Sequence, residues 1–191
     1  KGKFGIFGDG KELPQVVMSH FFKDGDYRSG YYRDQTLLMS QNLLSAREIF
    51  AAVYGHPDKL YEKMSGGRQM AGHFLTNTID ENNNWIDQTS QKNHISDISP
   101  TASQMSRLVG LGLASKIYRN NSISGSEKFS KNGNEVVWGT IGNASTSQGI
   151  FFEAVNACGV LQIPTIISVW DDEYGISCLL YTSPSPRDFE A

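Results

Sequence analysis

The sequence has little net charge, few cysteines and no long apolar run, and each absence excludes a class of protein. Its 191 residues carry a formal net charge of −3, so nothing favours nucleic acid or an anionic membrane as a partner. No apolar stretch approaches the roughly 20 residues of a membrane-spanning helix, and the opening residues do not resemble a signal peptide. Cys158 and Cys178 form no metal-binding or redox motif, and we therefore expect a reducing, cytoplasmic setting.

What is present is the composition of a folded domain. Hydrophobic residues make up 39% of the chain and charged residues 19%, as in globular proteins rather than disordered ones. The length is sufficient for one domain with its own hydrophobic core.

The clearest structural pattern lies in residues 135–170. EVVWGTI (135–141) is typical of a strand and is followed by a loop of small residues, GNASTSQG (142–149). IFFEAVNACGVLQ (150–162) is a nearly apolar helix, and IPTIISVW (163–170) is a second strand that is apolar on both faces. This order predicts an α/β fold with a parallel sheet that is covered by helices on both faces.

Upstream elements are shorter. KELPQVVMSHFF (11–22) predicts a helix, and Ser45 with Glu48 forms a capping box before a second helix over 46–54. After Pro100, apolar residues recur with helical period as far as residue 117. Polar, turn-rich segments predict loops over 24–36, 64–74 and 79–93.

The chemistry is expected beyond the two predicted strands of residues 135–170, because parallel sheets bind ligands at the carboxyl ends of their strands. The first strand leads into small residues at 142–149, where backbone N–H groups and the next helix's positive end suit a phosphate or diphosphate. The second strand leads into Asp171 and Asp172. A divalent cation such as Mg²⁺ would reconcile these carboxylates with an anion. Without other signals, such a pair is more often a solvated pair at the start of a helix.

The same segment resembles a known motif. Thiamine diphosphate enzymes carry a motif that begins Gly-Asp-Gly and ends in Asn-Asn, and GNASTSQGIFFEAVNACGVLQIPTIISVWDDEYGIS (142–177) is similar to its form in the alpha subunit of 2-oxo acid dehydrogenases. GYYRDQ (30–35), GGRQMAGHF (66–74) and ISPTASQMSRLVG (98–110) resemble three further motifs of that family, the last two in their branched-chain form. The order of four motifs is more specific than any one of them.

The resemblance implies roles for individual residues. It implies that cofactor contacts come from Tyr32, Arg33, Ser99, Pro100, Gly142, Ala144 and Ser145. Arg33 is expected on the diphosphate as a planar donor fork. The implied Mg²⁺ ligands are the side chains of Asn143 and Asp172 and the carbonyl of Tyr174. His73, in the Arg-Gln-Met loop, is a candidate catalytic residue near the substrate channel or, equally, a loop residue that only donates or accepts hydrogen bonds.

The sequence also departs from the family pattern. Asn143 stands where the family has Asp or Glu, and Asp172 where it has Asn, so the two exchanges preserve a single carboxylate. Trp170 replaces a polar residue that is an arginine near the phosphates in branched-chain enzymes, and Thr101 replaces a leucine that supports the bent cofactor. The Gly-Asp-Gly at residues 8–10 is followed by no polar pair after a strand, so we do not expect it to be the motif.

Both ends of the sequence suggest a fragment. We expect residues 1–177 to be part of a thiamine-diphosphate-binding dehydrogenase domain and residues 178–191 not to be native sequence. The Ser-Pro-Ser-Pro run excludes helix interior or central strand, and CLLYTSPSPRD resembles translated sequencing-adapter read-through.

The function that the resemblance implies is oxidative decarboxylation of branched-chain 2-oxo acids, dependent on thiamine diphosphate and Mg²⁺. The implied partners are a beta half or subunit that completes the active site, and a lipoyl-bearing acyltransferase core that accepts the acyl group. The activating glutamate belongs to the beta half, so we expect the fragment alone to be inactive. Alternatives are another thiamine diphosphate enzyme (pyruvate or acetoin dehydrogenase, or transketolase-like) or a non-catalytic Mg²⁺-phosphate binding module. A flavodoxin-like or Rossmann binder is the weakest alternative, because neither fingerprint occurs.

Overall fold

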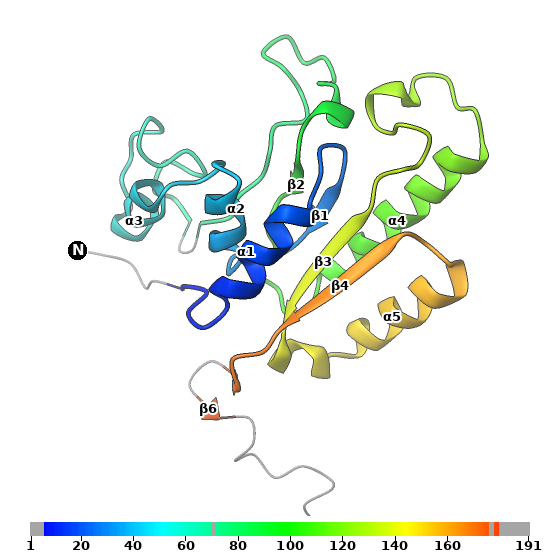
Figure 1. Ribbon diagram of the computed structural model, residues 1–191. Coiled ribbons are helices and arrows are strands. Elements are labelled where there is room, and N and C mark those ends of the chain that lie inside the picture. Colours follow the sequence, from blue (N-terminus) through cyan, green and yellow to red (C-terminus); the bar gives the residue numbers. More distant parts are fainter. Residues whose placement is uncertain (1–5, 70–71, 176–177, 180–191) are drawn as a thin grey trace, which may run out of the picture.

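The computed structural model contains a sheet of four parallel strands in the order β2-β1-β3-β4 (Figure 1). The structure describes residues 6–69 and 72–175, and the backbone alone of residues 178–179. Its helices are α1 (Glu12–Phe21), α2 (Gln35–Ser40), α3 (Ala46–Tyr54), α4 (Gln104–Asn120) and α5 (Gly149–Leu161). Its strands are β1 (Tyr27–Ser29), β2 (Asn93–Ile95), β3 (Val137–Gly142), β4 (Thr165–Trp170), β5 (Tyr174–Gly175) and β6 (Cys178–Leu179).

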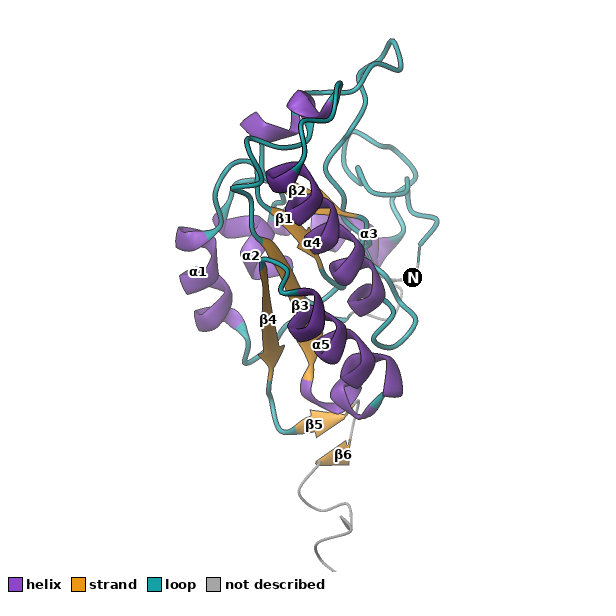
Figure 2. Cartoon of the chain, turned by 90° about the vertical axis from the view of Figure 1, so that its right-hand side faces the viewer, coloured by secondary structure: helices purple, strands orange, loops and turns teal. Residues whose placement is uncertain are grey.

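Helices lie on both faces of the sheet, as the sequence predicted. In Figure 2, α1 and α2 lie on one side of the strands, and α4 and α5 on the other. Each face has its own apolar core. One joins α4 and α5 to the sheet through buried residues that include Leu108, Val137 and Ala154. The other joins α1 and α2 to it through Phe22, Leu37 and Trp138.

The predicted strand–loop–helix–strand unit is confirmed. Strands β3 and β4 pair in parallel over their whole length, from Val137 opposite Thr165 to Gly142 opposite Trp170. Because the two strands end level, the segments that follow them start side by side. β4, however, lies at the edge of the four-stranded sheet rather than in its interior. Its Ile166 and Val169 are 41% and 43% exposed.

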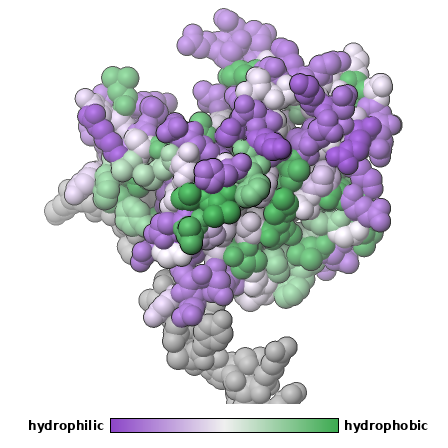
Figure 3. Space-filling view, viewed as in Figure 1, coloured by the Kyte–Doolittle hydropathy of each residue, from purple (hydrophilic) through white to green (hydrophobic). Residues whose placement is uncertain are grey.

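Exposed apolar side chains continue from β4 onto two helices. Figure 3 shows apolar surface gathered on the face that carries α1 and β4. α1 contributes Leu13, Val17 and Phe21, which recur every four residues and therefore lie on one face of the helix. α5 also exposes large apolar side chains, among them Phe152 and Val160.

The helices expected over 11–22 and 46–54 are α1 and α3. At the start of α3 the capping box is present, with the Ser45 side chain accepting from the Glu48 N–H and the Glu48 carboxylate accepting from the Ser45 N–H. Gly55 ends this helix in the left-handed conformation, with φ of 67°.

The loop expected over 24–36 is wrong in part, because it contains β1 and the start of α2. β1 is an interior strand between β2 and β3, and all three of its residues are buried, including Arg28. A three-residue strand with a charged centre shows no apolar alternation, so the sequence could not reveal it. β2 begins at Asn93, the last residue of the predicted 79–93 loop, and this strand of three residues is also too short to show a pattern.

The tail that we expected not to be native, 178–191, lies outside the described residues apart from the backbone of 178–179. The last two residues of the motif, at 176 and 177, are also outside them. No helix in the described part of the chain is both long and apolar enough to cross a membrane.

Candidate cofactor site

A cavity of about 380 Å³ lies just beyond the carboxyl ends of all four parallel strands. Each strand is followed by a segment that lines it. The lining residues are Tyr31–Arg33 after β1, Ile98–Ala102 and Gln104 after β2, Gly142–Ser145 after β3, Asp172, Tyr174 and Gly175 after β4, and Lys11 before α1. Every residue expected to touch the cofactor or the metal is in this set.

The small residues after β3 form one wall. Gly142 ends the strand, and Asn143–Ser147 form a short 3₁₀ turn before α5 begins at Gly149. A Cβ on Gly142 would lie only 3.3 Å from the Tyr31 hydroxyl oxygen, so the glycine keeps space open between the two. The N-terminus of α5 is not in the cavity wall, contrary to the expectation that this helix would present its positive end there. The intervening 3₁₀ turn displaces it.

The expected metal ligands lie in the same cavity but have protein partners. Asn143 donates its side-chain N–H to Asp171 Oδ1 at 2.6 Å. Asp172 forms an ion pair with Lys11 and accepts the Tyr174 N–H at 3.3 Å. Burial by itself would raise the pKa of Asp172, but the Lys11 ammonium outweighs it and holds that pKa below its usual range.

Lys11 was missed by the sequence reasoning. Its side chain is 3% exposed and reaches Asp172, whose side chain is 27% exposed. The turn of residues 8–10 brings it there, with the Lys11 N–H bonded to the Gly8 carbonyl and Gly10 at φ of 78°. The only signal in the sequence was a lysine directly after a glycine-rich turn.

Tyr31, Tyr32 and Arg33 line the cavity together, and the rings of Tyr31 and Tyr32 are in edge-to-face contact, with their centres 5.4 Å apart. The Arg33 guanidinium donates to the Phe7 carbonyl at 2.9 Å and lies 5.6 Å from the centre of the Tyr32 ring. The Arg33 carbonyl accepts from Gln15 Nε2 at 3.0 Å. Arg33 is therefore held by its backbone and one hydrogen bond, with its charge beside the cavity.

His73 is outside the cavity wall but touches it. Its Nε2 is hydrogen-bonded to the Ser99 hydroxyl, and its ring centre lies 6.0 Å from that of Tyr32. Ser99 and Pro100 line the cavity themselves. His73 thus contacts two residues of the cavity wall, Ser99 and Tyr32, without lining the cavity itself.

The other two departures from the family pattern, Thr101 and Trp170, lie in different places. Thr101 lines the cavity. Trp170 does not: it is buried and donates its indole N–H to Asp34 at 2.7 Å, away from the lining residues. It therefore supplies no substitute for an arginine at the phosphates.

The cavity suits an anion with a bound cation. Among the described lining residues, Lys11 and Arg33 are the cations and Asp172 is the only anion, so this set carries a net charge of +1. Tyr31 is buried, and its hydroxyl has no hydrogen-bond partner among the described residues. No three His, Cys, Asp or Glu side chains of the described part of the chain form a metal cluster. The expected set instead has one carboxylate, one amide and one carbonyl, and this composition suits Mg²⁺ that takes further ligands from a phosphate and water.

A parallel sheet with a cavity at the carboxyl ends of its strands is the architecture of an α/β ligand-binding domain. Residues 1–185 match the family of the dehydrogenase E1 component, and the chain belongs to that family. Membership implies thiamine diphosphate as cofactor. Over 176 residues the chain is 27% identical to the 2-oxoisovalerate dehydrogenase subunit alpha of Bacillus subtilis (strain 168), covering 91% of this chain and 44% of that protein. The chain thus spans less than half the length of this relative.

Proposed function

We propose that this chain is the diphosphate-binding part of the alpha-type component of a 2-oxo acid dehydrogenase. The observation that carries the proposal is the cavity at the strand ends, which gathers all the residues of the thiamine diphosphate motif that we expected to touch the cofactor or its metal. Four segments far apart in the sequence contribute to it. A chance resemblance of one motif would not bring residues of two further motifs to the same cavity.

The residues of the cavity contribute to binding in different ways. Arg33 and Lys11 hold the diphosphate by charge, and Gly142, Ala144 and Ser145 approach it closely because their side chains are small or absent. Asp172, with Asn143 and the Tyr174 carbonyl, holds Mg²⁺. When bound, thiamine diphosphate supplies a nucleophilic carbon and an electron sink for decarboxylation. The chain's own contribution is to anchor and orient this group.

The substrate and the partners belong to the proposal as well. A branched-chain 2-oxo acid is favoured, because the relative described above is a 2-oxoisovalerate dehydrogenase subunit. A beta half would complete the site, and a lipoyl-bearing acyltransferase would accept the acyl group. Exposed apolar side chains on α1, β4 and α5 support packing against further protein. A cytoplasmic setting stays a prediction from the cysteine content.

The test is cofactor binding by the complete protein that carries this chain. Arg33→Ala removes a charge-assisted hydrogen bond worth about 1.5–3 kcal/mol, so the Kd for thiamine diphosphate should rise about 10- to 150-fold. Arg47→Ala is the matched control, because Arg47 stacks on Tyr61 at 4.6 Å and is not among the cavity residues. The measurement is calorimetric titration at fixed Mg²⁺.

Two results would count against the proposal. Failure of the unaltered protein to bind thiamine diphosphate would exclude this cofactor. Equal Kd values for Arg33→Ala and Arg47→Ala would show that Arg33 does not bind the diphosphate. Binding without turnover in the presence of the beta component would favour the non-catalytic binding module. A substrate profile that prefers pyruvate or acetoin would correct the substrate class.

A further inference from the structure

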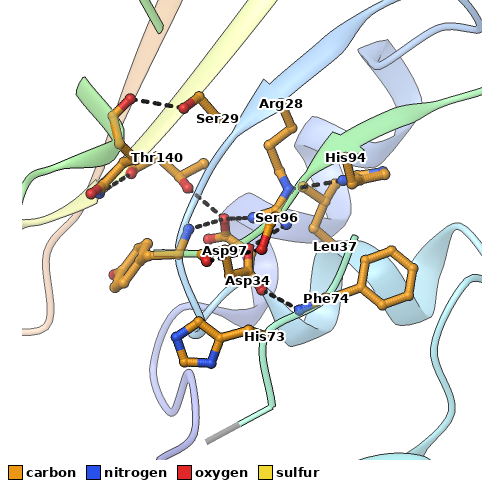
Figure 4. Close-up of polar contacts among 12 residues, drawn as sticks. Arg28, Ser29, Asp34, Leu37, His73, Phe74, His94, Ser96, Asp97 and Thr140 are labelled. Atoms are coloured by element: carbon orange, nitrogen blue, oxygen red, sulfur yellow. Dashed lines mark hydrogen bonds and ion pairs between the residues drawn. The ribbon is translucent and has the colours of Figure 1, made fainter. Parts of the chain in front are cut away.

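Adjoining the cavity loops is a group of buried polar side chains that we call the anchor cluster: Arg28, Asp34, Asp97, Thr140 and Trp170. Figure 4 labels the first four of them. Asp34 is its centre. Its carboxylate accepts from Arg28 Nη1 and the Thr140 hydroxyl, and from Trp170 Nε1 at 2.7 Å. Three strands, β1, β3 and β4, are thereby connected to one carboxylate.

Arg28 connects this centre to the fourth strand. Its Nη2 donates to Asp97 Oδ1 at 2.6 Å, just past the end of β2, and its Nε donates to His94 Nδ1 at 2.8 Å within β2. Asp97 in turn accepts the Phe74 N–H at 2.9 Å, next to His73. Burial would lower the pKa of Arg28, but Asp97 and Asp34 outweigh it and raise that pKa, so the guanidinium stays charged.

The members of the cluster stand next to the cavity in sequence but not in its wall. Asp34 directly follows Tyr31–Arg33, and Asp97 directly precedes Ile98–Ala102. Thr140 stands two residues before Gly142, and Trp170 two residues before Asp172. None of the five side chains lines the cavity. Each loop of the site is therefore attached, within two residues, to the same buried group.

A buried ionic group of this kind is a poor means of stabilisation. Desolvating the charges costs about as much as their attraction returns, and apolar side chains of similar volume often stabilise a core equally well. Hydrogen bonds to a shared carboxylate instead orient the groups that donate them, because each donor fixes the position of its own strand end. A displacement of about 1 Å in a binding group can cost as much as 100-fold in function.

From this arrangement we infer that the anchor cluster is a positioning device, which fixes the four cavity loops relative to one another and so sets ligand affinity without touching the ligand. The part that concerns thiamine diphosphate rests on the proposed function. The part that concerns the loops does not, because it follows from the contacts within the chain.

The test compares a hydroxyl within β3 with one that precedes this strand, in the complete protein that carries this chain. Thr140→Val keeps the shape of the side chain but removes a donor to Asp34, while Thr140→Ser keeps the donor. Ser130→Ala is the matched control: its hydroxyl donates to the buried Glu135 carboxylate at 2.9 Å, two residues before β3 starts, and neither residue lines the cavity. Trp170→Phe is a second variant, which removes the indole donor and keeps an aromatic ring.

Two readouts are needed. Calorimetry with thiamine diphosphate and Mg²⁺ should show a Kd at least tenfold higher for Thr140→Val and Trp170→Phe, and within threefold of the unaltered protein for Thr140→Ser and Ser130→Ala. Hydrogen–deuterium exchange without ligand should show faster exchange in segments 30–33, 98–102 and 142–145 for Thr140→Val and not for Ser130→Ala, even where urea unfolding finds both equally destabilised.

The outcomes distinguish the proposed function from the positioning role of the anchor cluster. If the unaltered protein does not bind thiamine diphosphate, the proposed function fails, and the exchange data still decide on the cluster. If Thr140→Val and Ser130→Ala change exchange in the same segments, or if neither changes it, the cluster is only part of the core. If Thr140→Val does not fold, Trp170→Phe gives the decision by the same two measurements.

Discussion

Exchanging the carboxylate between positions 143 and 172 is the sharpest test of the metal site. Asp172 is the only charged protein ligand in the expected Mg²⁺ set, so Asp172→Asn should leave the cation with none. Two charges attract a single charge at about 4 Å with roughly 2 kcal/mol in water and about 8 kcal/mol at an effective dielectric of 20. Because the Asp172 side chain is 27% exposed, the lower part of this range applies. A loss of about 2–4 kcal/mol corresponds to a roughly 30- to 1,000-fold higher Kd for the cofactor at fixed Mg²⁺.

The double variant Asn143→Asp with Asp172→Asn should recover at least tenfold of this loss, since it restores one carboxylate to the set. Recovery should be partial. The Asn143 amide now donates to Asp171, and a carboxylate in its place would face that neighbour's negative charge until the cation binds. The assay is calorimetric titration of both single variants and the double variant of the complete protein.

A substitution of Lys11 separates the effect of Asp172→Asn on stability from its effect on cofactor affinity. Asp172→Asn leaves a nearly buried ammonium without its counter-ion, which should lower the free energy of unfolding by about 1–3 kcal/mol, between the values for exposed and buried pairs. Adding Lys11→Met should restore most of that stability but not the affinity. If Asp172→Asn binds the cofactor normally, or if the double exchange is no better than Asp172→Asn, the charge-exchange hypothesis is refuted.

Two further predictions follow from the sequence and the fold. Burial, and then Arg28, lower the pKa of His94 well below 6.5, so below pH 6.5 only the unfolded chain takes up a proton there. Relative to His94→Gln, the free energy of unfolding should therefore decline by up to about 1.4 kcal/mol per pH unit as the pH falls below 6.5. If urea unfolding gives the same stability difference between the two proteins at pH 7.5 and at pH 5.5, this prediction is wrong. The isolated 191-residue chain should release no CO₂ from 2-oxoisovalerate with thiamine diphosphate and Mg²⁺, because the activating glutamate is expected from the beta half; turnover would show that the chain holds a complete site.

The best-predicted parts of the chain are those with strong local patterns. The apolar runs of β3, α5 and β4 and the capping box of α3 depend on residues that are near one another in sequence, and the structure has these elements where the patterns indicated. The residues that the motifs indicated also line one cavity, because the loops that follow parallel strands meet at one edge of the sheet.

Lys11, Arg28 and Asp34 show what the sequence left undetermined. Lys11 is paired with Asp172 from the opposite end of the chain, and Arg28 is the buried centre of a strand too short to give a pattern. Asp34 does lie in a loop, but the sequence did not show that its carboxylate is buried and connects three strands. A charged side chain is ordinarily on the surface, and local sequence does not state which distant partners will permit its burial.

The sequence by itself therefore determined the class of fold, the family and the list of residues at the strand ends, because these depend on local apolar patterns and on motif order. Only the tertiary structure decided which charges face the cavity and which lie beneath it. The physical reason is that the burial of a charge depends on partners that the sheet brings together. Arg28 is enclosed by Asp97, which follows β2, and Asp34, which precedes α2, while Arg33, a few residues on, stays beside the cavity.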